Sequence, residues 1–416
     1  MARKKNLLHK FGEKMELSFK NENNSRIFTA THHGNVLGYV AIDSTVGGRS
    51  CGGLRMLPDI DETEIQTLAH SMTLKYGFLG LPQGGAKAGV FGNPDSSRQE
   101  RLERLVEFGL AIKPLLQTKA YIPYSDMGTQ NSDLHYMLNA VGIPVGRRDL
   151  QNNASGYYTA ISVLTGVLQA ARHIGLNLSV CTAAVEGFGS VGSSLAGLLA
   201  GEGIRVIAIS TRRGALYNPS GLDVDRLVQL AEEAGSRVVE VYRGAERIDR
   251  EKLLELPVDI LCPCARWTSL TMSNVPRISA SIICPGANNP VTPDAEHALF
   301  ERGVLCLPDF VTNCGGVLGG TMEFASVSRE KITAFIGRHI GIRIASLLNE
   351  AKSKHQLPRE VAVPFALRRF NQVAQSAEHP TPLSRLSNLG LEFYRQGWIP
   401  GRLVAPLALR YFKKRL

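Results

Sequence analysis

Residues 183–200, which read AAVEGFGSVGSSLAGLLA, decide the fold expected for this chain. Gly187, Gly189 and Gly192 stand in G-x-G-x-x-G register between an apolar strand-like run and an apolar helix-like run. The first glycine permits a tight turn, the second lets backbone approach a pyrophosphate, and the third lets the helix pack close to the strand. The helix N-terminus offers amides and a positive dipole end to phosphates. The pattern predicts a dinucleotide site; the alternative is a βα turn that packs closely for structural reasons alone.

Strand-like and helix-like segments alternate around this motif. A helix-like run covers residues 156–175, and apolar strand-like runs follow at 204–210, 259–263, 281–286 and 304–309. This alternation predicts a parallel, doubly wound sheet of the Rossmann type. Towards the N-terminus, residues 35–50 predict an apolar strand ended by glycines and residues 62–80 predict a helix.

The length of 416 residues suggests two domains rather than one. We expect an α/β chain with a first domain over residues 1–150 and the Rossmann-type domain over residues 151–325. Residues 326–416 look mainly helical and can return to the first domain. The last helix-like stretch has Val404, Leu407, Ala408 and Tyr411 on one face. Packing on its own domain is favoured for that face over a membrane surface or a partner.

Composition narrows the class of protein further. No apolar run is long enough to span a membrane and no secretory signal is evident, so a cytoplasmic location is expected. The seven cysteines lack zinc-like spacing and lie mostly in apolar runs, which predicts no metal site and a reducing compartment. The net charge of +10 would suit anionic partners. Because nucleic-acid motifs are missing from the sequence, we expect no nucleic-acid partner.

The end of the second strand after the glycine motif bears on the choice between NAD and NADP. An acid that accepts the ribose hydroxyls of NAD is expected about 20 residues after the motif. The chain has Thr211 there, followed by Arg212 and Arg213. Two cations in place of an acid favour NADP slightly over NAD, unless the arginines are only solvated loop residues.

Two lysines and an aspartate are candidates for chemistry in the first half. Lys75 continues the apolar stripe of its helix, so its amine either reaches water or lies in a cleft. Lys87 lies in a glycine-rich stretch where bare backbone would let a ligand approach; its glycines are Gly84, Gly85 and Gly89. A desolvated lysine there can act as an acid or a base. Asp126 lies in a loop between a strand and a helix and, taken alone, predicts a cap or a turn.

Seven segments resemble the glutamate/leucine/phenylalanine/valine dehydrogenases and follow the order found in that family. They are GGLRM, MTLK, GGAKAG, SDMGT, EGFGSVG, PGANNPVTPDA and NCGGV, and they span roughly residues 35–325. The resemblance implies an enzyme that converts an L-amino acid to its 2-oxo acid and ammonia with NAD or NADP. It also implies that the first domain binds substrate and mediates assembly into a homo-oligomer.

The resemblance implies roles for residues on the substrate side. Lys75 would hold the α-carboxylate, and Lys87 would activate the water that attacks the imine. Asp126 would carry protons to and from the amine. Gly52 and Gly53 would line the substrate cleft. These steps need an anion clamp, a base tuned near neutral pH and a proton carrier.

On the cofactor side the resemblance implies that the three glycines of the motif bind the pyrophosphate. Asn288 and Asn313 would position the nicotinamide end, and Thr211 and Arg212 would lie at the adenosine end.

The chain departs from the glutamate-specific members of the family at two positions. Cys51 replaces a lysine, and Gly320 replaces a serine, that bind the side-chain carboxylate in those members. A carboxylate buried without partners costs several kcal/mol. An apolar substrate, branched or aromatic, is therefore favoured. The alternatives are glutamate dehydrogenase, a catalytically silent nucleotide-binding homologue that acts as a regulatory subunit, and a nucleic-acid-associated protein supported by charge alone.

Overall fold

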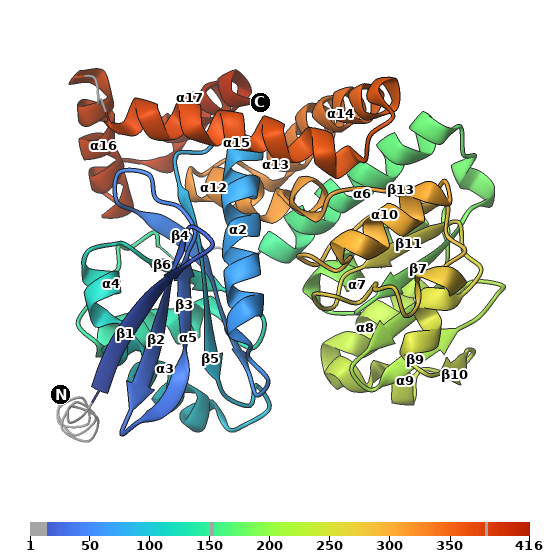
Figure 1. Cartoon of the computed structure of the whole chain (residues 1–416), viewed down its shortest axis with the longest axis horizontal. Helices are drawn as coiled ribbons and strands as arrows, with labels where there is room; N and C mark the ends of the chain where they lie inside the picture. The colour runs from blue at the N-terminus through green and yellow to red at the C-terminus, as the bar shows by residue number, and fades with distance from the viewer. Residues whose placement is uncertain (1–14, 150–153, 379–381) are drawn as a thin grey trace. The chain divides into compact units, whose positions relative to one another are not determined.

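The computed structural model describes residues 15–149, 154–378 and 382–416 (Figure 1). Contacts divide the chain into two compact units. Residues 1–153 and 366–404 form the first unit, and residues 154–365 and 405–416 form the second. Each unit contains one sheet covered by helices. The predicted two-domain α/β architecture is confirmed.

The first unit is built on a six-stranded sheet in the order β1-β2-β3-β5-β4-β6. The strands are β1 (Met15–Glu22), β2 (Ser25–His32), β3 (Asn35–Ile42), β4 (Ser50–Leu57), β5 (Gly84–Phe91) and β6 (Ile122–Ser125). Strands β1, β2, β3 and β5 pair antiparallel, whereas β4 is parallel to both β5 and β6. The strand predicted over residues 35–50 is β3, which ends at Ile42; Gly47 and Gly48 follow with φ values of 58° and 74° before β4 begins.

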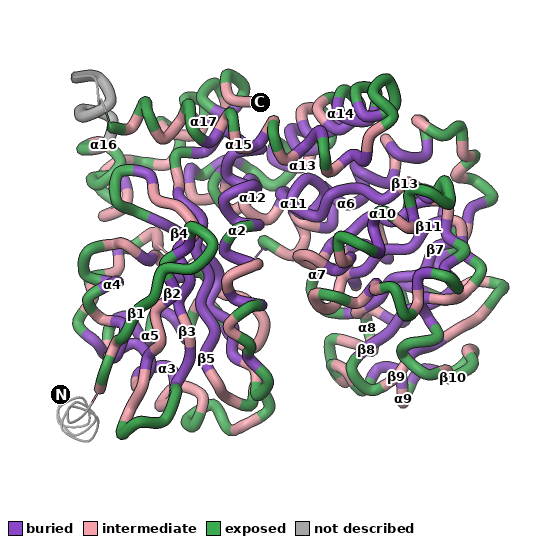
Figure 2. The backbone as a smooth tube through the Cα atoms, viewed as in Figure 1, coloured by how far each residue is buried: buried purple, intermediate pink, exposed green. Residues whose placement is uncertain are grey.

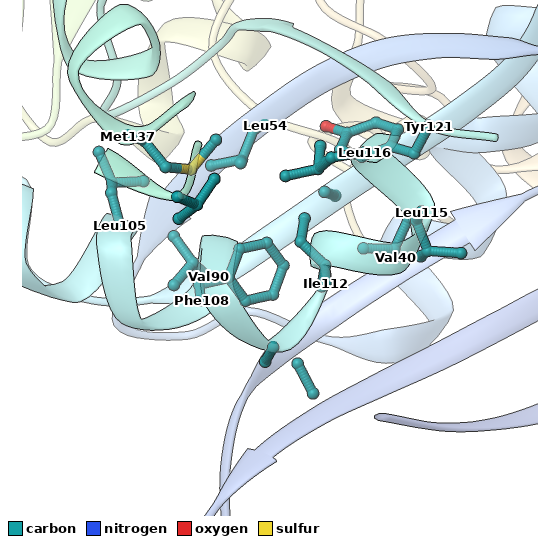
Figure 3. Close-up of a cluster of buried hydrophobic side chains, with 14 of the residues drawn as sticks. Val40, Leu54, Val90, Leu105, Phe108, Ile112, Leu115, Leu116, Tyr121 and Met137 are labelled. Atoms are coloured by element: carbon teal, nitrogen blue, oxygen red, sulfur yellow. The ribbon is translucent and has the colours of Figure 1, made fainter. Parts of the chain in front are cut away.

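Helices cover both faces of this sheet. They are α2 (Glu62–Leu79), α3 (Arg98–Ala111), α4 (Lys113–Gln117) and α5 (Asn131–Ala140), and α16 (Pro382–Arg395) also belongs to this unit. Helices α3, α4 and α5 pack on one face, where Phe108, Ile112 and Met137 meet Leu54 and Val90 of the strands (Figure 3). On the other face, Ile65 and Ala69 of α2 pack on Ala41 of β3.

Residues of β4 and β5 alternate between these two faces. Those that enter the core shared with α3–α5 are Leu54, Met56, Ala86, Ala88 and Val90. Arg55 and Lys87 fall between them in sequence and therefore face α2. Both side chains are buried, at 4% and 3% exposure. Because buried charges are rare unless they are paired, this face is the candidate location of the active site.

The second unit contains a seven-stranded sheet in the order β10-β9-β8-β7-β11-β12-β13. The strands are β7 (Thr182–Glu186), β8 (Arg205–Thr211), β9 (Gly214–Tyr217), β10 (Glu246–Ile248), β11 (Ile260–Pro263), β12 (Ile282–Ile283) and β13 (Leu305–Cys306). Five neighbours, from β8 to β13 in this order, run parallel, which confirms the doubly wound sheet. The antiparallel edge strands β9 and β10 were not predicted.

The helices of the second unit begin with α6 (Ser155–Ile174), which matches the predicted 156–175. The next are α7 (Ser190–Gly201), α8 (Val224–Ala234), α9 (Val238–Val241), α10 (Pro293–Glu301), α11 (Asp309–Thr312), α12 (Gly315–Phe324), α13 (Arg329–Phe335) and α14 (Gly341–Lys354). Helices α15 (Pro358–Glu378) and α17 (Gly401–Arg415) each contribute residues to both units. Figure 2 shows the strands β7 and β11 buried beneath this cover.

The packing predicted for the C-terminal helix is wrong in part. In α17 the side chains of Ala408 and Phe412 are buried, but those of Leu407 and Tyr411 are 63% and 40% exposed. Ala408 of the predicted face is therefore buried as expected, whereas Leu407 and Tyr411 of that face are not. In the described part of the chain, no helix combines the length and the apolarity needed to cross a membrane.

Candidate active site

Three buried charged groups and one partly buried carboxylate, that of Asp126, form a connected network on the α2 face of the first unit. Lys87 Nζ lies 2.5 Å from Asp126 Oδ2. Arg55 Nε donates to the same oxygen at 3.0 Å, and Arg55 Nη2 forms an ion pair with it at 3.0 Å. Its Nη1 donates to Glu64 Oε1 of α2. The Asp126 side chain is 19% exposed and is the most open of the four, so the network reaches the surface of its unit there.

Local backbone structure brings Asp126 and Lys87 together. At Gly53 on β4, a Cβ atom would lie 2.8 Å from Asp126 Cβ and 3.0 Å from Lys87 Nζ, so a larger residue would displace the pair. The backbone N–H of Asp126 donates to Thr129 Oγ1 at 3.0 Å, and the Thr129 hydroxyl donates to the Leu54 carbonyl at 2.7 Å. The loop after β6 is thereby fixed to β4, and the carboxylate is fixed with it.

The charges of the network shift the pKa values of its members. Burial alone would raise the pKa of the Asp126 carboxyl, but the charges of Arg55 and Lys87 outweigh burial and hold it well below its usual range. Burial lowers the pKa of the Lys87 amine; Asp126 opposes that shift and Arg55 adds to it. Asp126 is therefore ionised in this state, and Lys87 loses its proton more readily than an ordinary lysine.

The glycines around Lys87 do not serve the purpose predicted for them. At Gly85 a Cβ would lie 2.3 Å from the Thr73 backbone nitrogen of α2, and at Gly89 it would lie 2.7 Å from Ile65 Cδ1. At Gly84 a Cβ would lie 2.2 Å from the carbonyl oxygen of Ser44. The expectation that these glycines admit a ligand is wrong, because they admit helix α2 and the segment after β3.

Lys75 lies in the C-terminal half of α2, which is buried on all sides. Its side chain does not reach water freely, since the residue is 5% exposed. The helix ends at Leu79 and is capped by Gly80, whose φ of 65° is the left-handed conformation that glycine favours. At Gly77, one turn earlier, a Cβ would lie 2.2 Å from the Ala366 carbonyl of α15. Lys75 is thus held in a helix that is packed closely on two sides.

Cys51 and Gly52 lie at the start of β4, directly before Gly53. Cys51 is buried, its thiol donates to Gln83 Oε1 at 3.3 Å, and burial raises its pKa to about 12. The side chain at this position is therefore a neutral thiol. At Gly52 a Cβ would lie only 1.6 Å from the Ala86 carbonyl, so no side chain fits.

In the second unit, the three glycines of the motif differ in what surrounds them. Gly187 has a φ of 88°, which glycine adopts without strain. A Cβ at Gly192 would lie 1.8 Å from the Gly187 carbonyl, whereas a Cβ at Gly189 would meet nothing within 4 Å. Gly189 is the N-cap of α7, and among the described residues no side chain caps that helix. Space beside an uncapped helix N-terminus fits a pyrophosphate.

Thr211, Arg212 and Arg213 occupy a tight connection between β8 and β9. Thr211 ends β8 as predicted; its side chain is buried and donates to the Ser236 carbonyl at 2.8 Å. Arg212 Nε donates to Ser236 Oγ at 3.1 Å. Arg213 Nη1 lies 3.3 Å from Glu240 Oε1. Both arginines are exposed, but Arg213 is already paired with Glu240.

Asn288 and Asn313 are brought together at the carboxyl edge of the second sheet. Asn313 Nδ2 donates to Asn288 Oδ1 at 2.9 Å and to the Ala287 carbonyl at 3.0 Å. Its Oδ1 is buried without a hydrogen-bond partner among the described residues, so it can accept a bond from a carboxamide. Asp309 fixes the same loop through the Asn289 amide at 3.0 Å, and Arg359 of α15 donates to Asp309 at 2.8 Å. Gly320 lies on α12 of this unit.

Sequence reasoning missed Arg55, Glu64 and Arg359. The available signal was the placement of Arg55 between Leu54 and Met56, since a charge within an apolar strand needs a partner. The partner of Arg55 could not be read from the sequence because β6 and α2 come from separate segments.

Comparisons with known proteins identify the class. The family model for Glutamate/Leucine/Phenylalanine/Valine dehydrogenase matches residues 153–377, and the model for the Glu/Leu/Phe/Val dehydrogenase dimerisation domain matches residues 24–142. The chain is 36% identical over 303 residues to the glutamate dehydrogenase of Thermotoga maritima, with 69% of this chain and 72% of that protein covered. Identity to the NAD-specific glutamate dehydrogenase of Staphylococcus aureus is 34% over 299 residues, with 69% and 72% covered.

A solved structure agrees in fold. The hetero-hexameric glutamate dehydrogenase from Thermus thermophilus matches with a TM-score of 0.71 at 22% identity, covering 89% of this chain and 91% of that chain. Together these matches define an NAD(P)-dependent oxidoreductase that acts on the CH–NH2 group of amino acids. The chain belongs to the glutamate/leucine/phenylalanine/valine dehydrogenase family, as its motifs predicted.

Proposed function

We propose that this amino-acid dehydrogenase acts on an apolar L-amino acid, branched or aromatic, and uses Lys87 and Asp126 for proton transfer. The observation that carries the proposal is the buried Lys87–Asp126 pair, 2.5 Å apart, close beside Gly53. Cys51 precedes the two glycines of β4 and presents a neutral thiol, whereas a side-chain carboxylate would require a cation.

The residues fit the steps of oxidative deamination. Bound NAD(P) supplies the acceptor for the hydride that leaves the α-carbon. Lys75 holds the α-carboxylate and so orients the substrate. Lys87, when neutral, takes a proton from the water that attacks the imine carbon, and Asp126 exchanges protons with the departing amine. Because Lys87 Nζ and Asp126 Oδ2 already share a hydrogen bond, a proton can pass between them without either side chain moving far.

The first prediction concerns the substrate. In a panel of amino acids, kcat/KM is expected to be higher for leucine, valine, phenylalanine or tryptophan than for glutamate, because a γ-carboxylate would lose its hydration without gaining a cation at position 51. Initial rates of cofactor reduction measure this directly. Glutamate as the best substrate would contradict the proposal for the pocket.

Glutamate dehydrogenase is the second candidate, and the names of the relatives favour it. Arg49 could then replace the missing lysine, since its charge acts on Cys51. Arg49→Ala separates the two candidates. It should raise KM for glutamate alone if Arg49 binds a carboxylate, and it should leave the preference for apolar substrates unchanged if it does not.

The second prediction concerns the cofactor. A modest preference for NADP is expected, because Thr211 carries no charge to repel the 2′-phosphate and Arg212 can donate to it. One charge-assisted hydrogen bond is worth about 1.5–3 kcal/mol, or roughly tenfold or more in affinity, before solvent and salt weaken it. Catalytic efficiency with both cofactors should show the preference, and Arg212→Ala and added salt should reduce it.

Glu240→Gln is a matched variant for the cofactor prediction. It removes the acid that faces Arg213 and should strengthen NADP binding without affecting NAD. A clear preference for NAD in the unmodified protein, as the name of the Staphylococcus aureus relative would suggest, would leave both arginines as surface charges.

We also propose that copies of the chain assemble into a homo-oligomer through the first unit, where the dimerisation-domain model matches.

A further inference from the structure

We propose that Arg55 is a positioning residue of the reaction: it holds the Asp126 carboxylate against Lys87 and places a second positive charge beside the Lys87 amine. This inference rests on the proposed role of Lys87 and extends it to a residue whose side chain is buried.

Geometry is the first support for this role. Arg55 and Lys87 approach the same oxygen, Asp126 Oδ2, from neighbouring strands. Arg55 Nε donates to that oxygen at 3.0 Å and Nη2 lies 3.0 Å from it, while Lys87 Nζ lies 2.5 Å from it, so the oxygen is held between the two cations. Arg55 cannot move away easily, because Nη1 is held by Glu64 of α2.

The charge balance of the network is the second support. Arg55 and Lys87 contribute two positive charges, and Asp126 and Glu64 contribute two negative ones, so the network is formally neutral. Within it, Arg55 and Lys87 compete for one carboxylate. Because Arg55 keeps its charge at any accessible pH, the proton that the network releases most readily is the one on Lys87.

The groups that face the pair come from several elements. Arg55 lies on β4, Glu64 on α2, and Tyr121 before β6; the pKa of the Tyr121 hydroxyl is raised by burial and by the charge of Asp126. Lys75 is carried by the same helix as Glu64. Of these, Arg55 lowers the pKa of Lys87, and Glu64 raises it.

The test is the pH dependence of kcat/KM in three variants. If neutral Lys87 is the base, kcat/KM rises with pH through the pKa of Lys87. This rise is the acid limb of the pH profile. Arg55→Met removes a positive charge near Lys87, so the pKa of Lys87 rises and the acid limb should move to higher pH by about one unit. Arg55→Lys keeps the positive charge but loses the planar guanidinium. The acid limb of this variant should therefore stay near that of the unmodified protein, while kcat falls. Glu64→Gln removes a negative charge and should move the limb to lower pH.

Opposite shifts in Arg55→Met and Glu64→Gln are the expected result, because general disruption of the fold would not give opposite signs. A uniform loss of kcat in Arg55→Met with the limb unmoved would overturn the proposal and leave Arg55 as a structural residue only. If the unmodified protein turned over no amino acid, the proposed function would fail instead.

A second measurement does not need turnover. Competitive labelling with acetic anhydride, followed by mass spectrometry of the peptide that contains Lys87, gives the pKa of that amine in each variant. The proposal predicts a higher pKa in Arg55→Met and a lower one in Glu64→Gln. Equal values in all variants would overturn it independently of any activity.

Discussion

Replacing Lys87 with alanine is expected to lower kcat/KM by roughly 10²–10⁴-fold, the usual contribution of a positioned acid or base. The physical reason is that Lys87 is the buried amine whose pKa is lowered by burial, and its Nζ is paired with the other proton carrier at 2.5 Å. Alanine leaves the water without a base. Steady-state rates of cofactor reduction measure the loss.

Cofactor binding should survive this substitution. The glycine motif belongs to the second unit, whereas Lys87 belongs to the first. The fluorescence of the reduced cofactor on binding should therefore be nearly unchanged in Lys87→Ala. Lys252→Ala is a matched control, because that lysine is 70% exposed. Near-normal turnover in Lys87→Ala would refute the role of this lysine.

Asp126→Asn is expected to have two large effects. Turnover should fall by roughly 10²–10⁴-fold, because asparagine cannot exchange protons with the amine. The free energy of unfolding should fall by about 3–5 kcal/mol, since Lys87 would be left buried without its carboxylate and Arg55 would keep only Glu64. Denaturant unfolding and initial rates measure the two effects separately.

A double variant distinguishes catalysis from stability. Lys87→Met combined with Asp126→Asn leaves Arg55 paired with Glu64, so the network is again formally neutral. Its stability should exceed that of Asp126→Asn alone, but its activity should remain lost. A double variant that regained turnover, or an Asp126→Asn protein with normal kcat, would show that the carboxylate only stabilises the fold.

The parts of the fold that could be predicted from the sequence have local signals. The parallel strands β7, β8 and β11 are apolar runs, and α6 ends at Ile174 and is capped by Gly175, which has a φ of 75°. The hairpin of β1 and β2 lacks such a signal, because β1 is an edge strand with mostly exposed side chains (Figure 2). Strand β9 is a short return from β8, and its pairing depends on the turn at Arg212 and Arg213 rather than on a run of apolar residues.

The candidate site could be predicted only as single residues. Motifs named Lys87 and Asp126, and the structure brings them within hydrogen-bonding distance. The motif GGLR also contained Arg55, but its role depends on pairing β4 with both β5 and β6, which no local pattern specifies. A glycine can leave open space for a ligand, or it can let a neighbouring element pack closely. The sequence alone did not distinguish these two possibilities for the glycines around Lys87.

The central claim is that this protein oxidises an apolar amino acid through Lys87. The most direct test follows the absorbance of reduced cofactor while leucine, valine, phenylalanine, tryptophan and glutamate are each added to the unmodified protein and to Lys87→Ala. We predict reduction of the cofactor with at least one apolar amino acid, faster than with glutamate, and loss of that reaction in Lys87→Ala. Absence of turnover with every amino acid, or equal turnover in the two proteins, would contradict the claim.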